Sequence, residues 1–222
     1  MDRALDSGYW KLNLVSRVVL TDLITSTTLQ SFRSNKFVVR VAFSPDGKYM
    51  ATASYDHSIV VYEASGPLVT VDEDDVLDDT DDPSLAGSPS LRYTEVKRIK
   101  LDSNPESILF HPSSTYLLYT TRSSHLLYYL DLTSWETKTK SFNPHPMDTH
   151  VSFTVLNMAL HPSGKVIAFQ TGDNRGTAGE RILFYGTEVE QVDRLGCIWT
   201  GSEGDDFVLP RMDWLPDGSG LM

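Results

Sequence analysis

Two histidines occupy matching positions in the chain and are the first candidates for metal chemistry. His111 and His161 each precede a proline in a similar tight-turn motif. Imidazole is a common zinc ligand, but a zinc site needs at least three protein ligands that converge on one point. The spacing of the histidines shows no such convergence. We therefore interpret both as surface turn residues and predict no metal site.

Nucleophile and phosphate-binding motifs point in the same direction. Cys197 lies between apolar residues with no charged neighbour to activate its thiol, which favours a small buried hydrophobe over a nucleophile. The glycines at Gly172, Gly176 and Gly179 are not followed by the Gly-Lys-Ser/Thr of a phosphate loop. No Gly-x-Ser-x-Gly elbow marks a hydrolase. We predict no catalytic residues and no cofactor.

Three other residues are candidates for contacts with a partner. Trp135 lies in a polar segment between two predicted strands, where we expect an aromatic ring to be exposed. Arg175 and Arg181 border a glycine-containing loop that widens another predicted hairpin. Binding residues are concentrated on loops that a rigid scaffold positions. We therefore predict Trp135, Arg175 and Arg181 as partner contacts.

Length and composition restrict the class of protein that carries these residues. The chain has 222 residues, enough for one ordinary domain, and its 40% hydrophobic and 22% charged content is typical of a globular protein. Its single cysteine cannot form an intrachain disulfide. No apolar run reaches the roughly 18 residues of a membrane span. We expect an intracellular protein, cytoplasmic or nuclear.

The net charge of −11 is concentrated in one segment. Eight acids and no base lie between positions 64 and 91, in the company of prolines and glycines. Such a run is typical of a disordered loop, and we assign 64–94 as an acidic insertion. It serves either as a solvated loop or as a docking segment for a basic partner, through Asp72, Glu73, Asp74, Asp75, Asp78, Asp79, Asp81 and Asp82. This charge also argues against direct binding of duplex nucleic acid.

A turn motif that occurs four times divides the rest of the chain. Apolar residues precede x-Pro-Asp/Ser-Gly/Ser at 42–47, 109–114, 159–164 and 213–218, a combination that favours tight turns. The first three turns are each followed by two short runs of β-branched, aromatic and other apolar residues. This pattern predicts antiparallel strands joined by hairpins. The turns are 67, 50 and 54 residues apart, and the insertion and two loops explain the excess over the roughly 40–45 of a propeller blade.

Residues 41–63 resemble a WD-repeat, with Tyr62-Glu63 in place of the family's Trp-Asp dipeptide. The resemblance implies an all-β fold, a β-propeller of four-stranded antiparallel blades, with about three complete blades and partial ones at both ends. Residues 18–30 resemble the last strand of one blade followed by the first of the next. The resemblance also implies structural turn roles for Asp46, Gly47, Asp56, Asp173, Asp217 and Gly218.

The sequence departs from the family pattern in two respects. The Gly-His pair that precedes each blade in the family is missing from most repeats, and His150, paired with Asp173, is the one candidate replacement. A closed propeller has 4 to 8 blades. We therefore expect the chain to be a fragment of a longer, seven-bladed propeller, or to be closed by partner strands. Its expected parts are a tail at 1–9 and a partial propeller at 10–222.

The resemblance implies a non-catalytic scaffold, whose loops and surface hold other proteins together in a complex. Two alternatives remain open. One is a propeller enzyme of lactonase type, with a metal in the central channel. The other is a peptide or chromatin reader. Stoichiometric bound metal in the purified protein would favour the enzyme.

Overall fold

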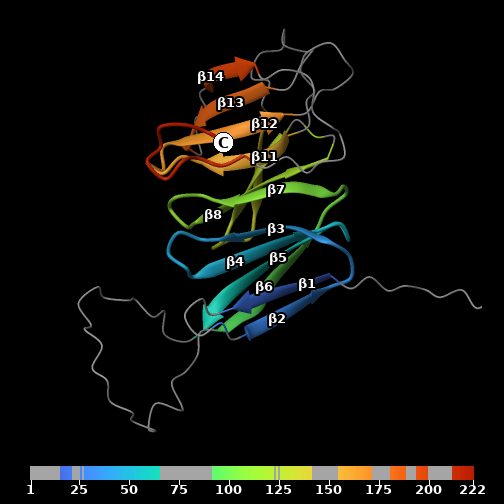
Figure 1. The fold of residues 1–222 in the computed structure, drawn as a ribbon. Helices are drawn as coiled ribbons and strands as arrows, with labels where there is room; N and C mark the ends of the chain where they lie inside the picture. The colour runs from blue at the N-terminus through green and yellow to red at the C-terminus, as the bar shows by residue number, and fades with distance from the viewer. Residues whose placement is uncertain are drawn as a thin grey trace, which may run out of the picture.

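The chain folds into small antiparallel sheets that lie side by side (Figure 1). The computed structural model describes residues 16–21, 26, 28–65, 92–122, 124, 126–141, 155–171, 181–188, 194–199 and 212–222. Three of the sheets have four strands each, and consecutive strands are neighbours within them. We call these sheets blades 1, 2 and 3.

Blade 1 consists of β3 (Val38–Phe43), β4 (Tyr49–Ser54), β5 (Ser58–Ser65) and β6 (Arg92–Lys100). Blade 2 consists of β7 (Pro105–Phe110), β8 (Tyr116–Thr121), β9 (Leu126–Asp131) and β10 (Thr137–Ser141). Blade 3 consists of β11 (Val155–Leu160), β12 (Val166–Thr171), β13 (Arg181–Gly186) and β14 (Arg194–Trp199). Successive blades meet along their first strands, β3 against β7 and β7 against β11. This is the predicted arrangement of four-stranded propeller blades.

Partial units flank the three blades. β1 (Ser16–Thr21) and β2 (Thr28–Ser34) form a two-stranded sheet, with Val18 opposite Phe32. The expectation that 18–30 spans two blades is therefore wrong, because its two strands pair with each other as one hairpin. Around the fourth turn motif, a bridge between Trp214 and Leu221 begins a further unit.

The acidic insertion joins the last two strands of blade 1. Ala64 pairs with Tyr93, and the strands extend to Ser65 on one side and from Arg92 on the other. The predicted limits of 64–94 are too wide at both ends, because backbone pairing continues past them. Residues 66–91, including all eight acids, lie outside the described residues.

The repeated motif forms the turn between the first and second strands of each blade. In blade 1, the carboxylate of Asp46 accepts hydrogen bonds from the Ser44 hydroxyl at 2.5 Å and the Lys48 N–H at 3.1 Å. Gly47 follows with a φ of 69°, a conformation that glycine adopts without a steric penalty. These local bonds and this backbone angle explain why the motif reverses the chain here.

The same chemistry recurs at two further turns. Asp217 accepts hydrogen bonds from the Ser219 N–H at 2.9 Å and the Ser219 hydroxyl at 2.7 Å, and Gly218 has a φ of 73°. At the other end of blade 1, Asp56 accepts the Ser58 N–H at 3.1 Å in the turn between β4 and β5. Asp173 lies outside the described residues.

Apolar side chains fill the spaces between sheets. Blades 2 and 3 share a cluster that includes Leu118, Tyr129, Phe169 and Tyr185, all nearly inaccessible to solvent. A second cluster lies between blades 1 and 2, and a third, around Phe32, between the β1–β2 sheet and blade 1. Each sheet therefore depends on its neighbours for burial, as expected of a repeat protein.

One turn aspartate makes a testable contribution at acid pH. Asp131 accepts the backbone N–H groups of Ser134 at 3.1 Å and Thr133 at 2.7 Å, and these bonds lower the pKa of its carboxyl. A carboxyl whose pKa is lowered by folding stabilises the fold at pH values above its unfolded pKa of about 3.9. This stabilisation is lost as the pH falls through the pKa of the folded protein. Asp131→Asn keeps an acceptor oxygen but does not titrate. We therefore expect the melting temperature of this variant to fall less between pH 5 and pH 3 than that of the unmodified protein. Equal losses would contradict this role.

Candidate partner-binding recess

Two stacked tyrosines form one wall of a recess between blades 1 and 2. Tyr119 on β8 and Tyr128 on β9 are opposite each other in the strand register. Their rings are 4.7 Å apart at an angle of 7°. Tyr119 is buried, whereas Tyr128 is half-buried. Burial raises the pKa of Tyr119. The wall is therefore an aromatic surface that strand pairing holds in place.

The opposite wall is the connection from blade 1 to blade 2. Two hydrogen bonds hold it, from the Leu101 N–H to the His57 carbonyl at 2.7 Å and from the Ser103 hydroxyl to the Arg122 carbonyl at 3.1 Å. The recess between the walls has a volume of about 460 Å³. It is lined by Ile99, Lys100, Leu101, Asp102, Ser103, Tyr119, Thr121, Arg122, Ser124, Tyr128 and Thr137.

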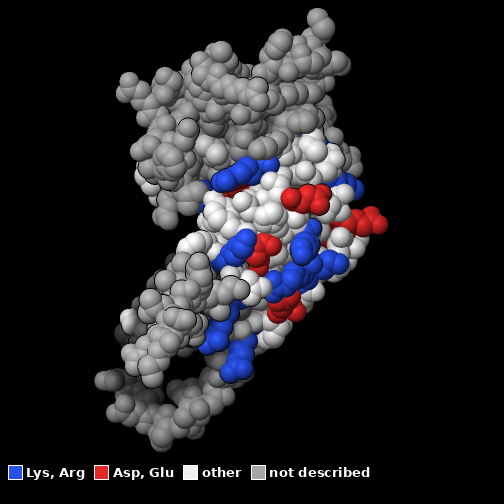
Figure 2. All heavy atoms as spheres, turned by 90° about the vertical axis from the view of Figure 1, so that its right-hand side faces the viewer, with Lys and Arg blue, Asp and Glu red and all other residues white. Residues whose placement is uncertain are grey.

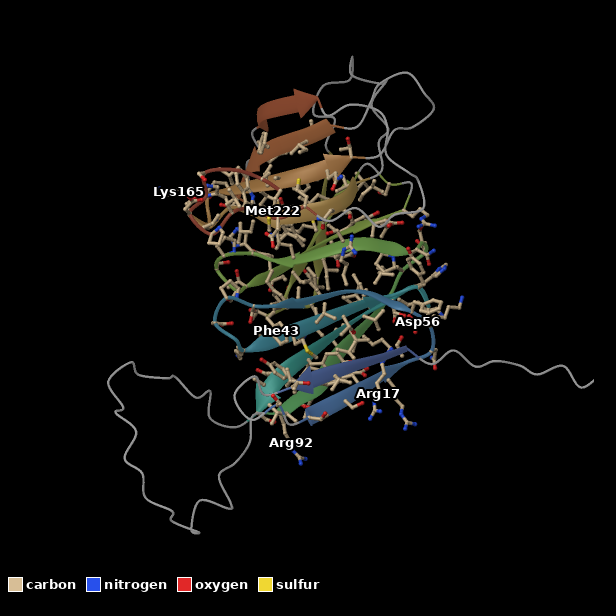
Figure 3. The ribbon with its side chains drawn as sticks, in the orientation of Figure 1. Arg17, Phe43, Asp56, Arg92, Lys165 and Met222 are labelled. Atoms are coloured by element: carbon tan, nitrogen blue, oxygen red, sulfur yellow. The ribbon has the colours of Figure 1, made fainter. Side chains whose placement is uncertain are left out.

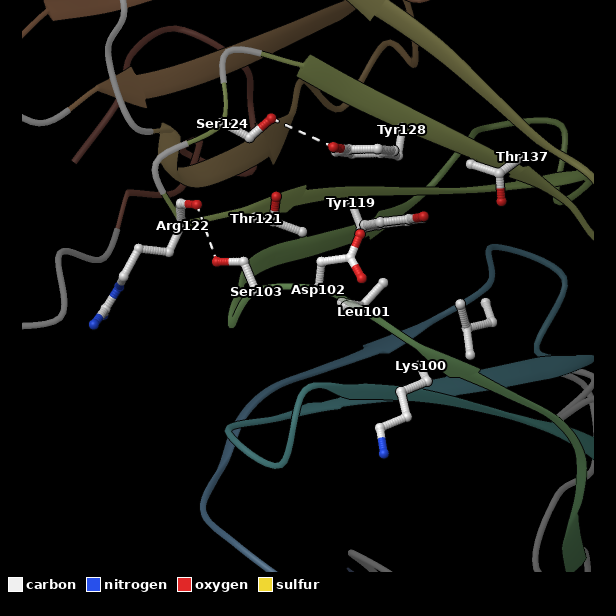
Figure 4. A pocket seen from close by; sticks show the side chains of 11 residues that line it. Lys100, Leu101, Asp102, Ser103, Tyr119, Thr121, Arg122, Ser124, Tyr128 and Thr137 are labelled. Carbon is white, nitrogen blue, oxygen red and sulfur yellow. Dashed lines mark hydrogen bonds between the residues drawn. The ribbon is translucent and has the colours of Figure 1, made fainter.

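The charged side chains of the lining differ in direction (Figure 4). The Asp102 carboxylate points toward the tyrosine pair, whereas the Lys100 ammonium and the Arg122 guanidinium point away from it. Asp102 is exposed to solvent. The Ser124 and Tyr128 hydroxyl groups lie 3.4 Å apart, which is long for a hydrogen bond. The recess thus combines an aromatic face, one inward carboxylate and several hydroxyl groups.

An ion pair fixes the rim of the recess. The Arg122 guanidinium contacts the carboxylate of Glu106 at 2.5 Å, and Glu106 is only 4% exposed. The hydrogen bond to Glu106 raises the pKa of Arg122. The guanidinium also lies 5.6 Å from the centre of the Tyr55 ring, and 3.4 Å from its hydroxyl, on the neighbouring blade. These contacts hold the Arg122 guanidinium at the rim of the recess and join the two blades.

The recess opens near the end of the blades that carries the turns between second and third strands. Asp56 marks this end and Lys165 the opposite one (Figure 3). On the described part of this end, Lys and Arg side chains alternate with Asp and Glu (Figure 2). The surface therefore has no single sign of charge, and local side chains decide what the recess attracts.

The two histidines lie at the opposite end and link neighbouring units. His111 Nδ1 accepts the Ser113 N–H at 3.1 Å, so its Nε2–H donates to the Thr187 carbonyl of blade 3 at 2.8 Å. His161 Nδ1 accepts the Ser163 N–H at 3.0 Å, and its Nε2 donates to the Gly218 carbonyl at 3.2 Å. Both are turn residues, as predicted, but they are half-buried between units instead of lying on the surface. The described residues contain no group of three or more His, Cys, Asp or Glu placed to hold a metal ion.

This pairing predicts a measurable loss on substitution of His161. We expect His161→Ala to lower the free energy of unfolding by about 1–2 kcal/mol. It removes the hydrogen bonds of the ring with Ser163 inside the turn, its bond to the Gly218 carbonyl and its edge-on contact with the Trp214 ring. His161→Asn should recover part of this loss, since its amide oxygen can accept the Ser163 N–H but its side chain is too short for Gly218. Urea denaturation of the three proteins measures the difference. Equal stability of both variants would contradict a contribution from the bond inside the turn.

The other residues singled out from the sequence have different outcomes. Trp135 is half-buried, packs against the cluster between blades 1 and 2, and has the Lys97 ammonium 5.9 Å from its ring centre. Its role in partner contacts stays a prediction. Arg175, His150 and the acidic run lie outside the described residues, as does the side chain of Arg181.

Sequence reasoning missed the residues of the recess. Tyr119 and Tyr128 lie in two predicted strands of one hairpin, so a register centred on the turn between them would have placed them opposite each other. No sequence pattern marks Asp102 in this way. The direction of its side chain depends on the hydrogen bonds that hold the connection between blades 1 and 2.

Comparisons with known proteins agree with this fold. Residues 26–63 match the WD40 family (WD domain, G-beta repeat), so the chain contains one recognisable WD repeat. No curated protein matches the chain. The structure of Kuenenia stuttgartiensis hydrazine synthase is similar, with a TM-score of 0.60, 15% identity, and coverage of 92% of this chain and 48% of that one.

The β-propeller domain of Cps50 (Swd1) from Myceliophteria thermophila is also similar. Its TM-score is 0.62 at 13% identity, with coverage of 92% of this chain and 54% of that one. The chain thus spans about half the length of these two structures. At these identities the likeness establishes the propeller fold. Among the described residues there is no helix of the length and hydropathy needed to cross a membrane.

Proposed function

We propose that this protein is a non-catalytic scaffold that binds other proteins through the recess between blades 1 and 2. The observation that carries the proposal is the recess itself. Its tyrosine wall is fixed by strand pairing, and its other wall by hydrogen bonds that Leu101 and Ser103 donate to backbone carbonyls. Rigid aromatic side chains beside a few polar groups are typical of protein-binding surfaces.

The match to a WD40 repeat supports the same proposal, because domains of this family commonly act as interaction scaffolds. A catalytic function has one point in its favour, since one of the similar structures, hydrazine synthase, is an enzyme. The described recess pairs no nucleophile with a base. We therefore favour binding over catalysis. Metal analysis of the purified protein tests the alternative, and a stoichiometric divalent ion would favour a lactonase-type enzyme.

Substitution of Tyr128 by a charged residue tests the binding function. We expect Tyr128→Arg to remove a defined subset of the proteins that copurify with the full chain, because a long cation would fill the recess. Glu188→Arg is the matched control, since Glu188 is an exposed residue beside Thr187, at the end of the blades where the histidines lie. Near-UV circular dichroism should show that both variants fold. Identical partner sets for Tyr128→Arg and the control would refute the proposal.

A further inference from the structure

We propose that the recess receives a basic side chain, arginine or lysine, from the partner protein. This inference rests on the proposed binding function and names the chemistry of the group that it accepts. Three features of the recess carry it: the direction of its charged side chains, its aromatic wall, and its size.

The direction of the charges makes the interior of the recess favourable for a cation. Asp102 is the one charged lining residue of the three whose side chain points toward the tyrosine pair (Figure 4). Lys100 points away, and Arg122 is held on the rim by Glu106 and Tyr55. Asp102 is exposed to solvent, so its carboxylate attracts a guanidinium or ammonium at short range, beside the tyrosine pair.

The tyrosine wall offers the second partner that a cation needs. Cations are attracted to the faces of aromatic rings within about 6 Å of the ring centre. This chain uses the interaction in its own fold, with lysine or arginine 5.1–5.9 Å from Tyr49, Tyr55, Tyr129 and Trp135. Within the described part of the chain, the Tyr119–Tyr128 pair is not among the rings that hold such a cation. Tyr128 is half-buried and Tyr119 is 3% exposed, so Tyr128 supplies the accessible part of this wall.

The recess is large enough to admit a long side chain, and its hydroxyl groups can bind the charged end. Its volume of about 460 Å³ lies in the lower part of the range of ligand pockets, about 300–1,000 Å³. Thr121, Ser124 and Thr137 contribute hydroxyl oxygens to the lining. A guanidinium carries five N–H donors and an ammonium three, and hydroxyl oxygens can accept them. A carboxylate ligand would instead face Asp102 as a like charge.

Titration with single amino-acid probes tests the inference on the full chain. The probes are Nα-acetyl-arginine N-methylamide, its lysine and glutamate counterparts, and its citrulline counterpart, which matches arginine in shape but is neutral. Chemical shifts of ¹³C-labelled tyrosine rings report binding at Tyr119 and Tyr128. We expect the arginine and lysine probes to bind about five- to twentyfold more tightly than the citrulline probe. Raising the salt concentration from 50 to 500 mM should reduce this preference.

Two variants and a control identify the groups responsible. Asp102→Asn should lower the affinity of the arginine probe to that of the citrulline probe. Tyr128→Leu should lower the affinity of the arginine probe by a similar factor. Glu188→Gln, an exposed carboxylate elsewhere, should change nothing. Equal binding of arginine and citrulline, or unchanged binding to Asp102→Asn, would overturn the inference. Tighter binding of the glutamate probe would also overturn it, because Lys100 and Arg122 would then set the charge of the recess.

The outcomes separate this inference from the proposed function. If Tyr128→Arg removes partners but the probes show no preference for a cation, the recess binds proteins by other chemistry and only this inference fails. If Tyr128→Arg leaves the partner set unchanged while the cationic probes bind, the proposed function fails and the cation site stands alone.

Discussion

Replacing Phe169 by alanine is expected to lower the free energy of unfolding by about 3–5 kcal/mol. The Phe169 side chain is fully buried between blades 2 and 3, where its ring meets that of Tyr185 edge-on with centres 5.4 Å apart. Removing it deletes buried apolar surface and leaves a cavity in the contact between two blades. Urea denaturation followed by near-UV circular dichroism measures the change.

Phe43→Ala is the matched control for this prediction. Phe43 is 49% exposed at the end of β3 and touches Tyr93 with ring centres 5.9 Å apart. We expect its loss to cost about 1 kcal/mol or less, because most of its surface is already in water. If both substitutions cost the same, burial of Phe169 between blades 2 and 3 would not explain its contribution to stability.

Replacing Arg122 by methionine is expected to cost about 2–3 kcal/mol. The change leaves the Glu106 carboxylate nearly buried without its cation, and an uncompensated buried charge is strongly destabilising. The effect should lie below that of a fully buried pair, because the Arg122 side chain is 52% exposed. Urea denaturation at pH 7 measures it.

A second substitution distinguishes the buried charge from lost packing. Glu106→Gln combined with Arg122→Met removes both charges, so the double variant should regain a large part of the lost stability. A double variant as unstable as Arg122→Met alone would contradict this explanation. It would instead assign the loss to the contacts of Arg122 with Tyr55.

Much of the fold could be predicted because its signals are local. Proline, aspartate and glycine in a fixed order set each turn, and short apolar runs set the strands on both sides. The paired strands and the φ angle of Gly47 follow from these rules. The expectation for 18–30 failed because the boundaries of a sequence repeat do not coincide with those of a sheet. Only the pairing of β1 with β2 shows that both strands belong to one sheet.

The recess could not be predicted because it depends on contacts between blades. Tyr119 and Tyr128 have the pattern of core residues in two strands, and only the contact between the blades shows that they line a recess with residues 99–103. The histidines show the same limit. His111 and His161 were placed in turns correctly, but their bonds to Thr187 and Gly218 join residues far apart in sequence.

Photo-crosslinking from inside the recess tests the central claim most directly. Ser103 lines the recess and would be replaced by the photoreactive residue p-benzoylphenylalanine in the full chain, with Lys165 at the opposite end of the blades as the matched position. We predict that position 103 forms an adduct with a discrete partner protein, through a peptide that contains arginine or lysine. This adduct should be lost on Asp102→Asn and should not form from position 165. Adducts of equal yield at both positions, or an adduct from position 103 that Asp102→Asn leaves unchanged, would contradict the account.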